Sequence, residues 1–307
     1  MRTSVRLATG DGFTADAVTC LDDHRDWSAQ QAGDHHLIVL VRRGRFRRRS
    51  RGHTADLDPT LAYLGLPGEE EHFAHPSGGD LCTSLALTGP LWHRLTGGRP
   101  LRPTLYVDGR LDLAHRRLLR ATRSGDAGFA VAESLLDLLR AALAQSPPPA
   151  ASTAPLAPCP ASGRPPGHHR HPGAVGGKAS GPARTGPGGA RRKVKGDSGP
   201  GLVSSAREAI AAGHPAAGGL LTLAALLEVS PFQLSRAFTR EMGVSLTHYR
   251  NRVRVAGALD RLEQGESDLA GLAVELGFAD QAHLTRTTRQ HVGHTPAALR
   301  RLLGAER

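Results

Sequence analysis

Apolar residues recur with the spacing of an α-helix in two segments near the C-terminal end of the chain, and the two segments are copies of one pattern. The first runs from Val229 to Gly243 and the second from Ala279 to Gly293. Matching residues lie fifty positions apart, as Leu234 does from Leu284. A fixed internal offset of this kind indicates a repeated structural unit.

Residues that begin and end helices bracket each copy. Ser230 can cap a helix N-terminus, Pro231 suits the first helical position because no N–H is needed there, and Gln233 stands three residues after the cap, as in a capping box. Gly243 can then end the helix in a left-handed conformation. In the second copy Asp280 is the predicted cap. We therefore expect one helix in each copy.

Each predicted helix has an apolar face and a polar face. Leu234 and Phe238 in the first copy, and Leu284 and Val292 in the second, mark the apolar faces at helical spacing. The opposite faces carry arginine and small polar side chains, with one aromatic. These outward positions are Phe232, Ser235, Arg236, Thr239 and Arg240 in the first copy and Gln281, His283, Thr285, Arg286 and Arg289 in the second.

A shorter apolar helix is predicted before each copy, over Thr222 to Glu228 and over Leu269 to Leu276. Two helices joined by a tight turn, the second exposing Arg and Gln, are typical of a helix-turn-helix, whose second helix enters the DNA major groove. Ser245 to about Glu263 joins the two units; as a helix of roughly 19 residues it would span about 28 Å. Successive major-groove faces on one side of B-DNA lie about 34 Å apart, so both recognition helices can reach neighbouring grooves.

Residues 206 to 303 resemble the AraC/XylS family of bacterial transcription regulators. The matching residues are Leu223, Ala224, Val229, Ser230, Pro231, Leu234, Ser235, Arg236, Phe238, Gly243, Tyr249, Arg254, Ala273, Gly277, Phe278, Asp280, Gln281, Leu284, Arg286, Gly293, Thr295, Pro296 and Ala297. The resemblance implies contacts with DNA bases or backbone by Phe232, Ser235 and Arg236 in the first recognition helix, and by Gln281, Ala282, His283, Thr285 and Arg286 in the second. One departure is Thr288, which stands where the family places a buried Phe; we expect the second unit to pack less tightly.

The outward arginines have two predicted roles. Arg240 and Arg289 favour phosphate contacts, because phosphate and sugar accept half to two-thirds of protein–DNA hydrogen bonds. Arg236 and Arg286 stand near the helix N-termini and are the candidates for base contacts, since bidentate Arg to guanine is the commonest specific pairing. For His283 a base contact and a plain surface position remain open alternatives.

Residues 1–110 are predicted to form a β domain. Short runs rich in β-branched or aromatic residues, separated by Gly and Pro turns, favour a sandwich or barrel. The predicted strands are His36–Val41, Phe46 to about His53, Thr60–Leu66 and Leu81–Leu87. In position this region resembles the cupin-like sensor domain of many AraC-type regulators, and Gly68 to His72 resembles its "PG…H" segment. A barrel mouth is a suitable site for a small-molecule effector.

Metal and disulfide chemistry find little support. The clustered histidines are His35, His36, His72 and His75, and the His-x-His followed by Glu of catalytic cupins is absent. Neighbours on a strand point to opposite faces, so His35 and His36 do not enter one site. The three cysteines, Cys20, Cys82 and Cys159, are widely spaced and odd in number, which offers neither a disulfide framework nor a CxxC zinc site. We predict no metal, no cofactor and no catalytic residue.

Seven arginines lie within Arg42 to Arg51. We interpret them as an exposed hairpin protected by charge, with binding of an acidic ligand or of DNA as the alternatives. After the β domain, residues 111–145 are predicted to form two amphipathic helices separated by Ser124 to Asp126. In the related regulators such a pair often forms a dimer contact; covering the sheet is the other reading.

Residues 146–201 are rich in Pro and Gly and almost lack large apolar side chains, so we expect a disordered linker. This segment holds 8 basic groups and 1 acid, and thus most of the net charge of +11. DNA binding is therefore inferred from the repeated helices and not from the charge. The tract Arg191 to Lys195 favours additional phosphate contacts. For His168 to His171, compositional drift is favoured over metal binding.

The sequence thus predicts a multidomain α+β protein with a cupin-like β-barrel or sandwich, a helical pair, a disordered linker and an all-α double helix-turn-helix over 202–307. No apolar run reaches the roughly 18 residues of a membrane helix, and no signal segment is seen, which predicts a cytoplasmic protein. The expected partners are double-stranded DNA, a small-molecule effector, RNA polymerase and a second copy in a homodimer. The alternative is a cupin-type enzyme or metal-binding protein with a DNA-binding tail.

Overall fold

The computed structural model describes residues 1–99, 101–123, 127–145 and 201–304. The linker predicted over 146–201, with Arg191–Lys195 and His168–His171, lies outside these ranges except for Gly201. Within the described part of the chain, no helix is long and apolar enough to cross a membrane.

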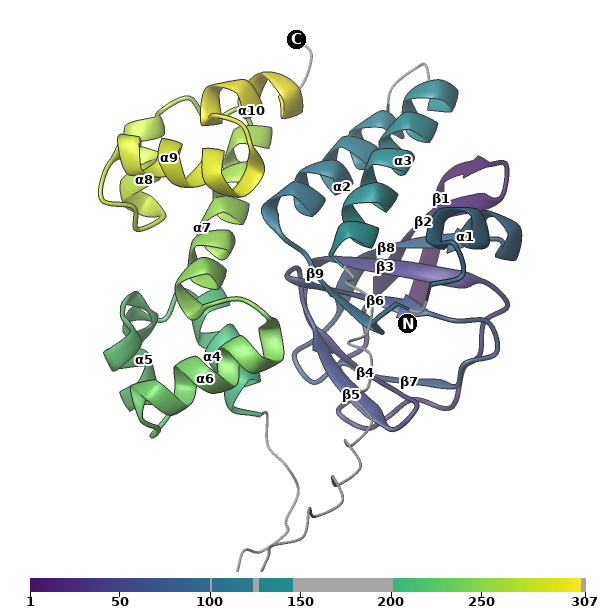
Figure 1. Ribbon diagram of the computed structural model, residues 1–307, viewed down its shortest axis with the longest axis horizontal. Coiled ribbons are helices and arrows are strands. Elements are labelled where there is room, and N and C mark those ends of the chain that lie inside the picture. Colours follow the sequence, from purple (N-terminus) through teal and green to yellow (C-terminus); the bar gives the residue numbers. More distant parts are fainter. Residues whose placement is uncertain (100, 124–126, 146–200, 305–307) are drawn as a thin grey trace, which may run out of the picture. The chain divides into compact units, whose positions relative to one another are not determined.

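Two antiparallel sheets make up the N-terminal part of the described chain (Figure 1). A six-stranded sheet has the order β1-β2-β8-β3-β6-β9, and a three-stranded sheet has the order β5-β4-β7. The strands are β1 Arg2–Gly10, β2 Phe13–Cys20, β3 His36–Arg43, β4 Phe46–Ser50, β5 His53–Leu57, β6 Leu61–Gly65, β7 Glu71–Ala74, β8 Asp80–Leu87 and β9 Thr104–Tyr106.

The larger sheet is buried on both faces, and β3 shows how. Its residues alternate: Ile38 and Leu40 pack beneath helices, whereas Val39 and Val41 face the smaller sheet with Phe46. Because successive side chains of a strand point to opposite faces, a strand covered on both sides has a continuous apolar sequence. The predicted run from His36 therefore forms a central strand.

Three helices cover the outer face of the larger sheet: α1 Gly89–Thr96, α2 Gly109–Ala121 and α3 Ala127–Ala144. Leu111 and Leu118 of α2 and Leu135 and Leu138 of α3 are fully or almost fully buried against it. Asp108 caps α2 by accepting hydrogen bonds from two backbone N–H groups. The predicted helical pair is present, and it covers the sheet, as one of its two readings proposed.

The predicted strands correspond to β3, β4, β6 and β8, but β1, β2, β5, β7, β9 and α1 were not predicted. β1 is an edge strand whose first five residues are exposed, so it lacks the apolar alternation that marks a half-buried strand. The predicted fold class is confirmed. Of the strands that were not predicted, β1, β5, β7 and β9 lie at sheet edges, whereas β2 lies inside the larger sheet.

The interpretation of the arginine-rich segment as an exposed hairpin holds only in part: β4 and β5 form a hairpin and Arg43 and Arg51 are exposed, but Arg48 is buried. The Arg48 side chain is 4% exposed; its Nη2 lies 2.6 Å from Glu71 Oε1, and its guanidinium lies over the ring of Tyr63. Arg45 pairs with Glu208, at 3.0 Å, from the C-terminal part of the chain. These cations hold separate strands and segments together, which sequence spacing alone does not reveal.

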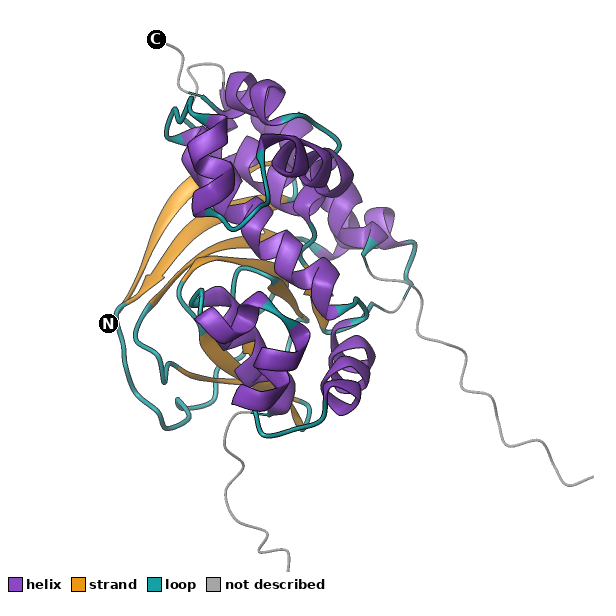
Figure 2. Cartoon of the chain, turned by 90° about the vertical axis from the view of Figure 1, so that its left-hand side faces the viewer, coloured by secondary structure: helices purple, strands orange, loops and turns teal. Residues whose placement is uncertain are grey.

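The C-terminal part is all helical, with two small bundles joined by one long helix (Figures 1 and 2). The helices are α4 Leu202–Ala211, the 3-10 turn η1 Pro215–Gly218, α5 Leu220–Leu226, α6 Pro231–Met242, α7 Leu246–Glu263, α8 Leu269–Glu275, α9 Gln281–Val292 and α10 Pro296–Leu303. α7 contributes Leu246 and Tyr249 to the core of the first bundle and Val255 and Leu259 to that of the second.

The turns that precede α6 and α9 differ by one residue. Glu228 and Gly277 hold the left-handed positions, with φ of 54° and 75°, and each ends its first helix. Between this position and the following N-cap the first turn has only Val229, whereas the second has Phe278 and Ala279. The fifty-residue offset of the recognition helices therefore becomes forty-nine in the helices before them.

Thr288 occupies a core position, as its match with Phe238 implies, and both side chains are 0% exposed. Within the described residues the Thr288 hydroxyl has no hydrogen-bond partner. A buried polar group without a partner is destabilising by about 1–3 kcal/mol.

We therefore expect Thr288→Val, which keeps the shape and removes the hydroxyl, to raise the free energy of unfolding by about 1 kcal/mol. Thermal and urea unfolding of the full chain measure the change. Thr247→Val on the exposed side of α7 is the control and should have little effect. A less stable Thr288→Val protein would mean that a bound water satisfies the hydroxyl.

Candidate DNA-binding surface and junction cavity

The first recognition helix, α6, is fixed at both ends by the predicted residues. Ser230 and Gln233 form a complete capping box, with Ser230 Oγ accepting from Gln233 N at 3.1 Å and Gln233 Oε1 accepting from Ser230 N at 3.1 Å. Gly243 ends the helix at φ 73°. Leu234 and Phe238 are fully buried beneath it. The rotation of α6 about its axis is therefore set by its core.

With this rotation, the side chains of α6 that are predicted to contact DNA point outward. Phe232, Arg236, Thr239 and Arg240 are exposed and Ser235 is half-buried. The Arg236 guanidinium lies 5.3 Å from the centre of the Phe232 ring. Such a cation–π contact orients the guanidinium at the first turn of the helix while leaving it accessible.

The second recognition helix, α9, has the same arrangement with a different cap. Asp280 accepts a hydrogen bond from His283 N at 2.6 Å, and Gly293 ends the helix at φ 87°. The outward positions Gln281, Ala282, Arg286 and Arg289 are exposed, and Thr285 is half-buried.

His283 is held by its own turn. Its Nδ1 accepts a hydrogen bond from Ala279 N at 3.2 Å, and its ring meets Phe278 edge to face. The half-buried ring thereby supports the turn before α9, which favours a structural role; its Nε2 remains for another contact.

One unbroken helix separates the two reading units. α7 has 18 residues and runs from the Ser245 cap to Glu263, which corresponds to about 27 Å at about 1.5 Å per residue. It packs closely on the second unit at Gly257, where an added Cβ would lie 3.1 Å from Leu276. The strut predicted from the sequence is present.

Buried arginines join the helical part to the β domain. Arg252, in the middle of α7, is 1% exposed; its Nε donates to Val107 O at 2.8 Å and its Nη2 lies 3.1 Å from Asp112. Arg207 of α4 is 2% exposed and its Nη2 lies 2.6 Å from Asp58. Breaking such a pair leaves a buried charge without compensation, which costs about 3–5 kcal/mol.

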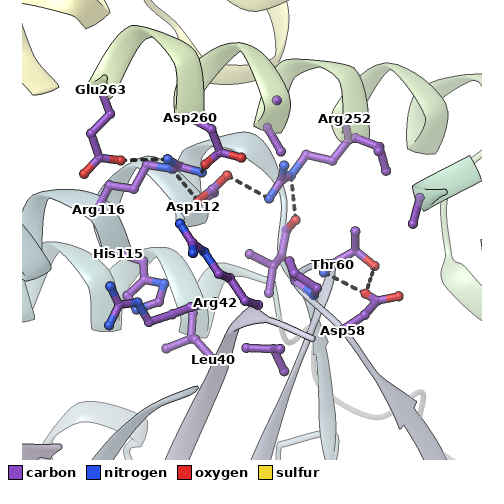
Figure 3. Close-up of a pocket in the computed structure, with 18 of the residues that line it drawn as sticks. Leu40, Arg42, Asp58, Thr60, Asp112, His115, Arg116, Arg252, Asp260 and Glu263 are labelled. Carbon is purple, nitrogen blue, oxygen red and sulfur yellow. Dashed lines mark hydrogen bonds and ion pairs between the residues drawn. The ribbon is translucent and has the colours of Figure 1, made fainter. Parts of the chain in front are cut away.

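Arg116 of α2 adds a partly exposed junction contact. Its guanidinium pairs with Asp112 on its own helix and reaches Asp260 at 2.7 Å and Glu263 at 2.9 Å on α7 (Figure 3). Burial alone would raise the pKa of Asp112, but the neighbouring Arg252 and Arg116 hold it below its ordinary value. Asp112 is thus the shared anion of two arginines from different parts of the chain.

A cavity of about 590 Å³ lies beside these pairs, between β3, α2 and α7. Arg42 points from β3 toward the Arg116–Asp112 pair (Figure 3). Burial, with Arg123 and Arg43 nearby, lowers the pKa of Arg42. Glu263 opposes this change, but among the described residues Arg42, Arg43 and Arg123 form no ion pair with a carboxylate. The cavity wall therefore has three arginines without a carboxylate partner, while its carboxylates pair with other arginines.

Comparison with known proteins identifies the helical region. Residues 223–302 match a family model described as a helix-turn-helix domain. The bifunctional transcriptional activator/DNA repair enzyme AdaA of Bacillus subtilis (strain 168) is 29% identical over 85 residues, which are 27% of this chain and 40% of AdaA. The chain therefore spans less than half of that relative.

Two of the similar solved structures match separate parts of the chain, and a third matches almost all of it. The C-terminal domain of AraT, a response regulator from Geobacillus stearothermophilus, is 27% identical, with a TM-score of 0.32, and the match covers 34% of this chain and 88% of that one. A cupin superfamily protein from Desulfitobacterium hafniense DCB-2 is 15% identical, with a TM-score of 0.26, over 29% of this chain and 78% of its own. ToxT from Vibrio cholerae O395 is 8% identical, with a TM-score of 0.33, and the match covers 96% of this chain and 99% of ToxT.

His115 gives the junction a dependence on pH. Burial lowers the pKa of this side chain from 6.5 to about 4, although Asp112 opposes the change. Its Nε2 lies 2.8 Å from Thr83 Oγ1. In the unfolded chain the imidazole takes up a proton below pH 6.5, whereas in the folded chain it stays neutral to about pH 4. The unfolded state then binds more protons, so stability is complete above pH 6.5 and is lost as the pH falls toward 4.

We expect His115→Gln to lose less stability than the wild type between pH 7 and 4.5, by an amount on the order of 2 kcal/mol. Urea unfolding at several pH values measures how the free energy of unfolding changes with pH. His294→Gln, at an exposed position, is the control and should follow the wild type. Identical slopes for the wild type and His115→Gln would contradict the assignment.

Proposed function

Because residues 223–302 belong to the AraC-type helix-turn-helix domains, we propose that this protein is a sequence-specific DNA-binding regulator of transcription. The observation that carries the proposal is a pair of helix-turn-helix units at the two ends of one continuous helix, each with an exposed arginine-bearing face. Its ligand is double-stranded DNA, and it acts by binding, without catalysis. A regulator of bacterial genes works in the cytoplasm, and RNA polymerase is the expected partner where it activates.

The two recognition helices are proposed to enter neighbouring major grooves. α7 sets the separation, which at about 27 Å is close to the roughly 34 Å between groove faces once the width of the bundles at its ends is added. Arg236 and Arg286, in the first two turns, are the proposed readers of bases. Arg240 and Arg289, one turn further along, are the proposed phosphate contacts.

Phe232, Ser235 and Thr239 on α6, and Gln281, Ala282 and Thr285 on α9, are proposed to complete the reading faces. Their positions flank the two arginines on the exposed sides of the helices. Apolar or small side chains at such positions can contact the thymine methyl group, and Gln can pair with adenine. His283 is the weakest member of this set because its ring is already held by the turn.

We also propose that a small anion regulates the protein from the cavity at the junction. Arg42, Arg43 and Arg123 supply the unneutralised charge, and a carboxylate or phosphate is the group that arginine pairs with best. Bound there, the anion would compete with Asp260 and Glu263 for Arg116. The contact between α2 and α7 would then weaken.

A homodimer is proposed through the exposed side of α3. Phe129 is 72% exposed and Leu136 is 42% exposed, and the two lie seven residues apart, on one face of the helix. Large apolar side chains on one exposed face are typical of an interaction surface.

Selection of binding sites from a random duplex library tests DNA reading. We expect a motif of two parts spaced by about one helical turn. Arg236→Ala should relax the base preference in one part and Arg286→Ala in the other, each with a loss of about 1–3 kcal/mol. Arg240→Ala and Arg289→Ala are the matched controls: they should weaken all sequences alike and reduce the salt dependence by about one phosphate contact. Uniform weakening by all four variants would assign Arg236 and Arg286 to phosphates.

Thermal unfolding with a panel of small carboxylates and phosphate esters tests the anion site. At least one compound should raise the thermal midpoint of the wild type and not that of Arg42→Gln. Arg94→Gln, at an exposed position on α1, is the control and should keep the response. Stabilisation of Arg42→Gln equal to that of the wild type would place the anion elsewhere.

A further inference from the structure

We propose that the β domain binds a divalent metal ion of the zinc class through Cys20, His75 and Asp80. The three side chains each offer one ligand atom, and these atoms all lie within 4.8 Å of one another. This site is separate from the DNA-binding surface and from the junction cavity, and it does not depend on the proposed function.

Three separate pieces of backbone bring the ligands together. Cys20 ends β2, and Asp80 begins β8 directly opposite it in the antiparallel ladder. Side chains of such a pair lie on the same face of the sheet. His75 follows β7 of the other sheet, and a short turn through Gly78 leads from it back to Asp80. The ligands therefore lie between the two sheets, at one end of the sandwich.

The distances suit a small metal ion. His75 Nε2 lies 2.9 Å from Asp80 Oδ1. Zinc binds nitrogen and oxygen at about 2.0–2.2 Å and sulfur at about 2.3 Å, so its ligand atoms lie about 3–4 Å from one another. Shifts of about an ångström would bring all three atoms to such a centre.

Burial and charge favour a cation at this place. Cys20, His75 and Asp80 are 6%, 7% and 8% exposed. In the described part of the chain the Asp80 carboxylate has no ion pair with Lys or Arg, and its Oδ1 accepts no hydrogen bond of good geometry despite its closeness to His75. A buried carboxylate is costly unless it is paired or coordinates a metal. A divalent ion would supply the missing charge.

Further contacts hold the ligands in place. Cys82 Sγ donates to Asp80 Oδ2 at 3.0 Å, which leaves Oδ1 toward His75. The other nitrogen of the His75 ring, Nδ1, lies 3.3 Å from His24 Nε2. Metal-binding histidines characteristically have such a partner at the second ring nitrogen, which fixes the ring.

The mixed sulfur, nitrogen and oxygen set selects the class of metal. Calcium and magnesium prefer oxygen ligands, whereas zinc accepts all three types in a tetrahedron. The fourth position opens on a cavity of about 300 Å³ that Cys20, His75 and Asp80 also line. Water or a small ligand can occupy it.

This set differs from the histidines weighed in the sequence. His72, in the "PG…H" segment, donates through Nδ1 to Ser28 O at 3.0 Å, and His36 stacks on Trp92. Of the clustered histidines only His75 belongs to the proposed site. The other two residues of the site, Cys20 and Asp80, come from other strands, so no local spacing in the sequence indicates them.

Metal titration of the full chain tests the proposal. The background is a variant in which His168, His169 and His171 are replaced by Gln, because that tract could bind metal on its own. After treatment with a chelator and addition of Co²⁺ or Zn²⁺, we expect one ion per chain by elemental analysis. Bound Co²⁺ should show a thiolate-to-cobalt charge-transfer band in the near ultraviolet.

Two ligand variants and two controls locate the ion. Cys20→Ser should remove the charge-transfer band, and Asp80→Asn should weaken binding by about tenfold or more. His72→Gln and Cys159→Ser should keep both stoichiometry and band. Absence of a stoichiometric ion in the background protein, or an unchanged band in Cys20→Ser, overturns the proposal. If either ligand variant fails to fold, the band and stoichiometry of the background protein, together with Cys159→Ser and Cys82→Ser, decide whether Cys20 is the sulfur ligand. DNA binding by the chelated protein, measured separately, tests the proposed function alone.

Discussion

The buried guanidinium of Arg252 is the contact on which the arrangement of the described chain most depends. It lies in the middle of α7, almost without exposure. Among the described residues Asp112 is its ion-pair partner, and the carbonyl of Val107 accepts a hydrogen bond from it. A charge in that position is tolerated only while both partners stay in place. The same helix carries a reading unit at each end. Whatever displaces Asp112 from Arg252 therefore acts on the strut that spaces the two recognition helices.

The β domain and the helical part are tied by cations at several points, and this makes the junction sensitive to charge. Arg207 of α4 forms an ion pair with Asp58 of the β domain. In the opposite direction, Arg45 of the β domain forms an ion pair with Glu208 of α4. Each pair joins residues more than a hundred positions apart in the sequence. The two parts therefore contact each other directly, through described residues that are far apart in the sequence.

A structural feature could be predicted where the residues that determine it are close together in the sequence. The helix-turn-helix units were predictable because caps such as Ser230 and terminal glycines such as Gly243 act within one turn, and the chain shows them twice. The one-residue difference between the turns was less visible, since Glu228 adopts the left-handed conformation without being glycine. The burial of Arg48 was not predicted because its partner Glu71 comes from another strand.

The proposed metal-ligand cluster gives no signal in the sequence for a related reason. Cys20 and Asp80 meet only because β2 pairs with β8 in one particular register, and β2 was not predicted at all. Histidines that are close along the chain can be recognised in the sequence, whereas the sheet brings together residues sixty positions apart. Strand register is set by packing on both faces of the sheet, so it cannot be derived from the spacing of the ligands themselves.

The charges around the junction cavity determine in which direction an anion would act. On the side of the β domain and α2 the free groups are cationic, whereas α7 presents Asp260 and Glu263. An anion attracted to Arg42 would draw Arg116 toward itself and repel the two carboxylates of α7. The Arg252–Asp112 pair, deeper and almost dry, would remain as the last tie between the parts. Without an anion the cavity thus favours the docked arrangement, and the proposed anion would favour a looser one in which both recognition helices move with α7 as a unit.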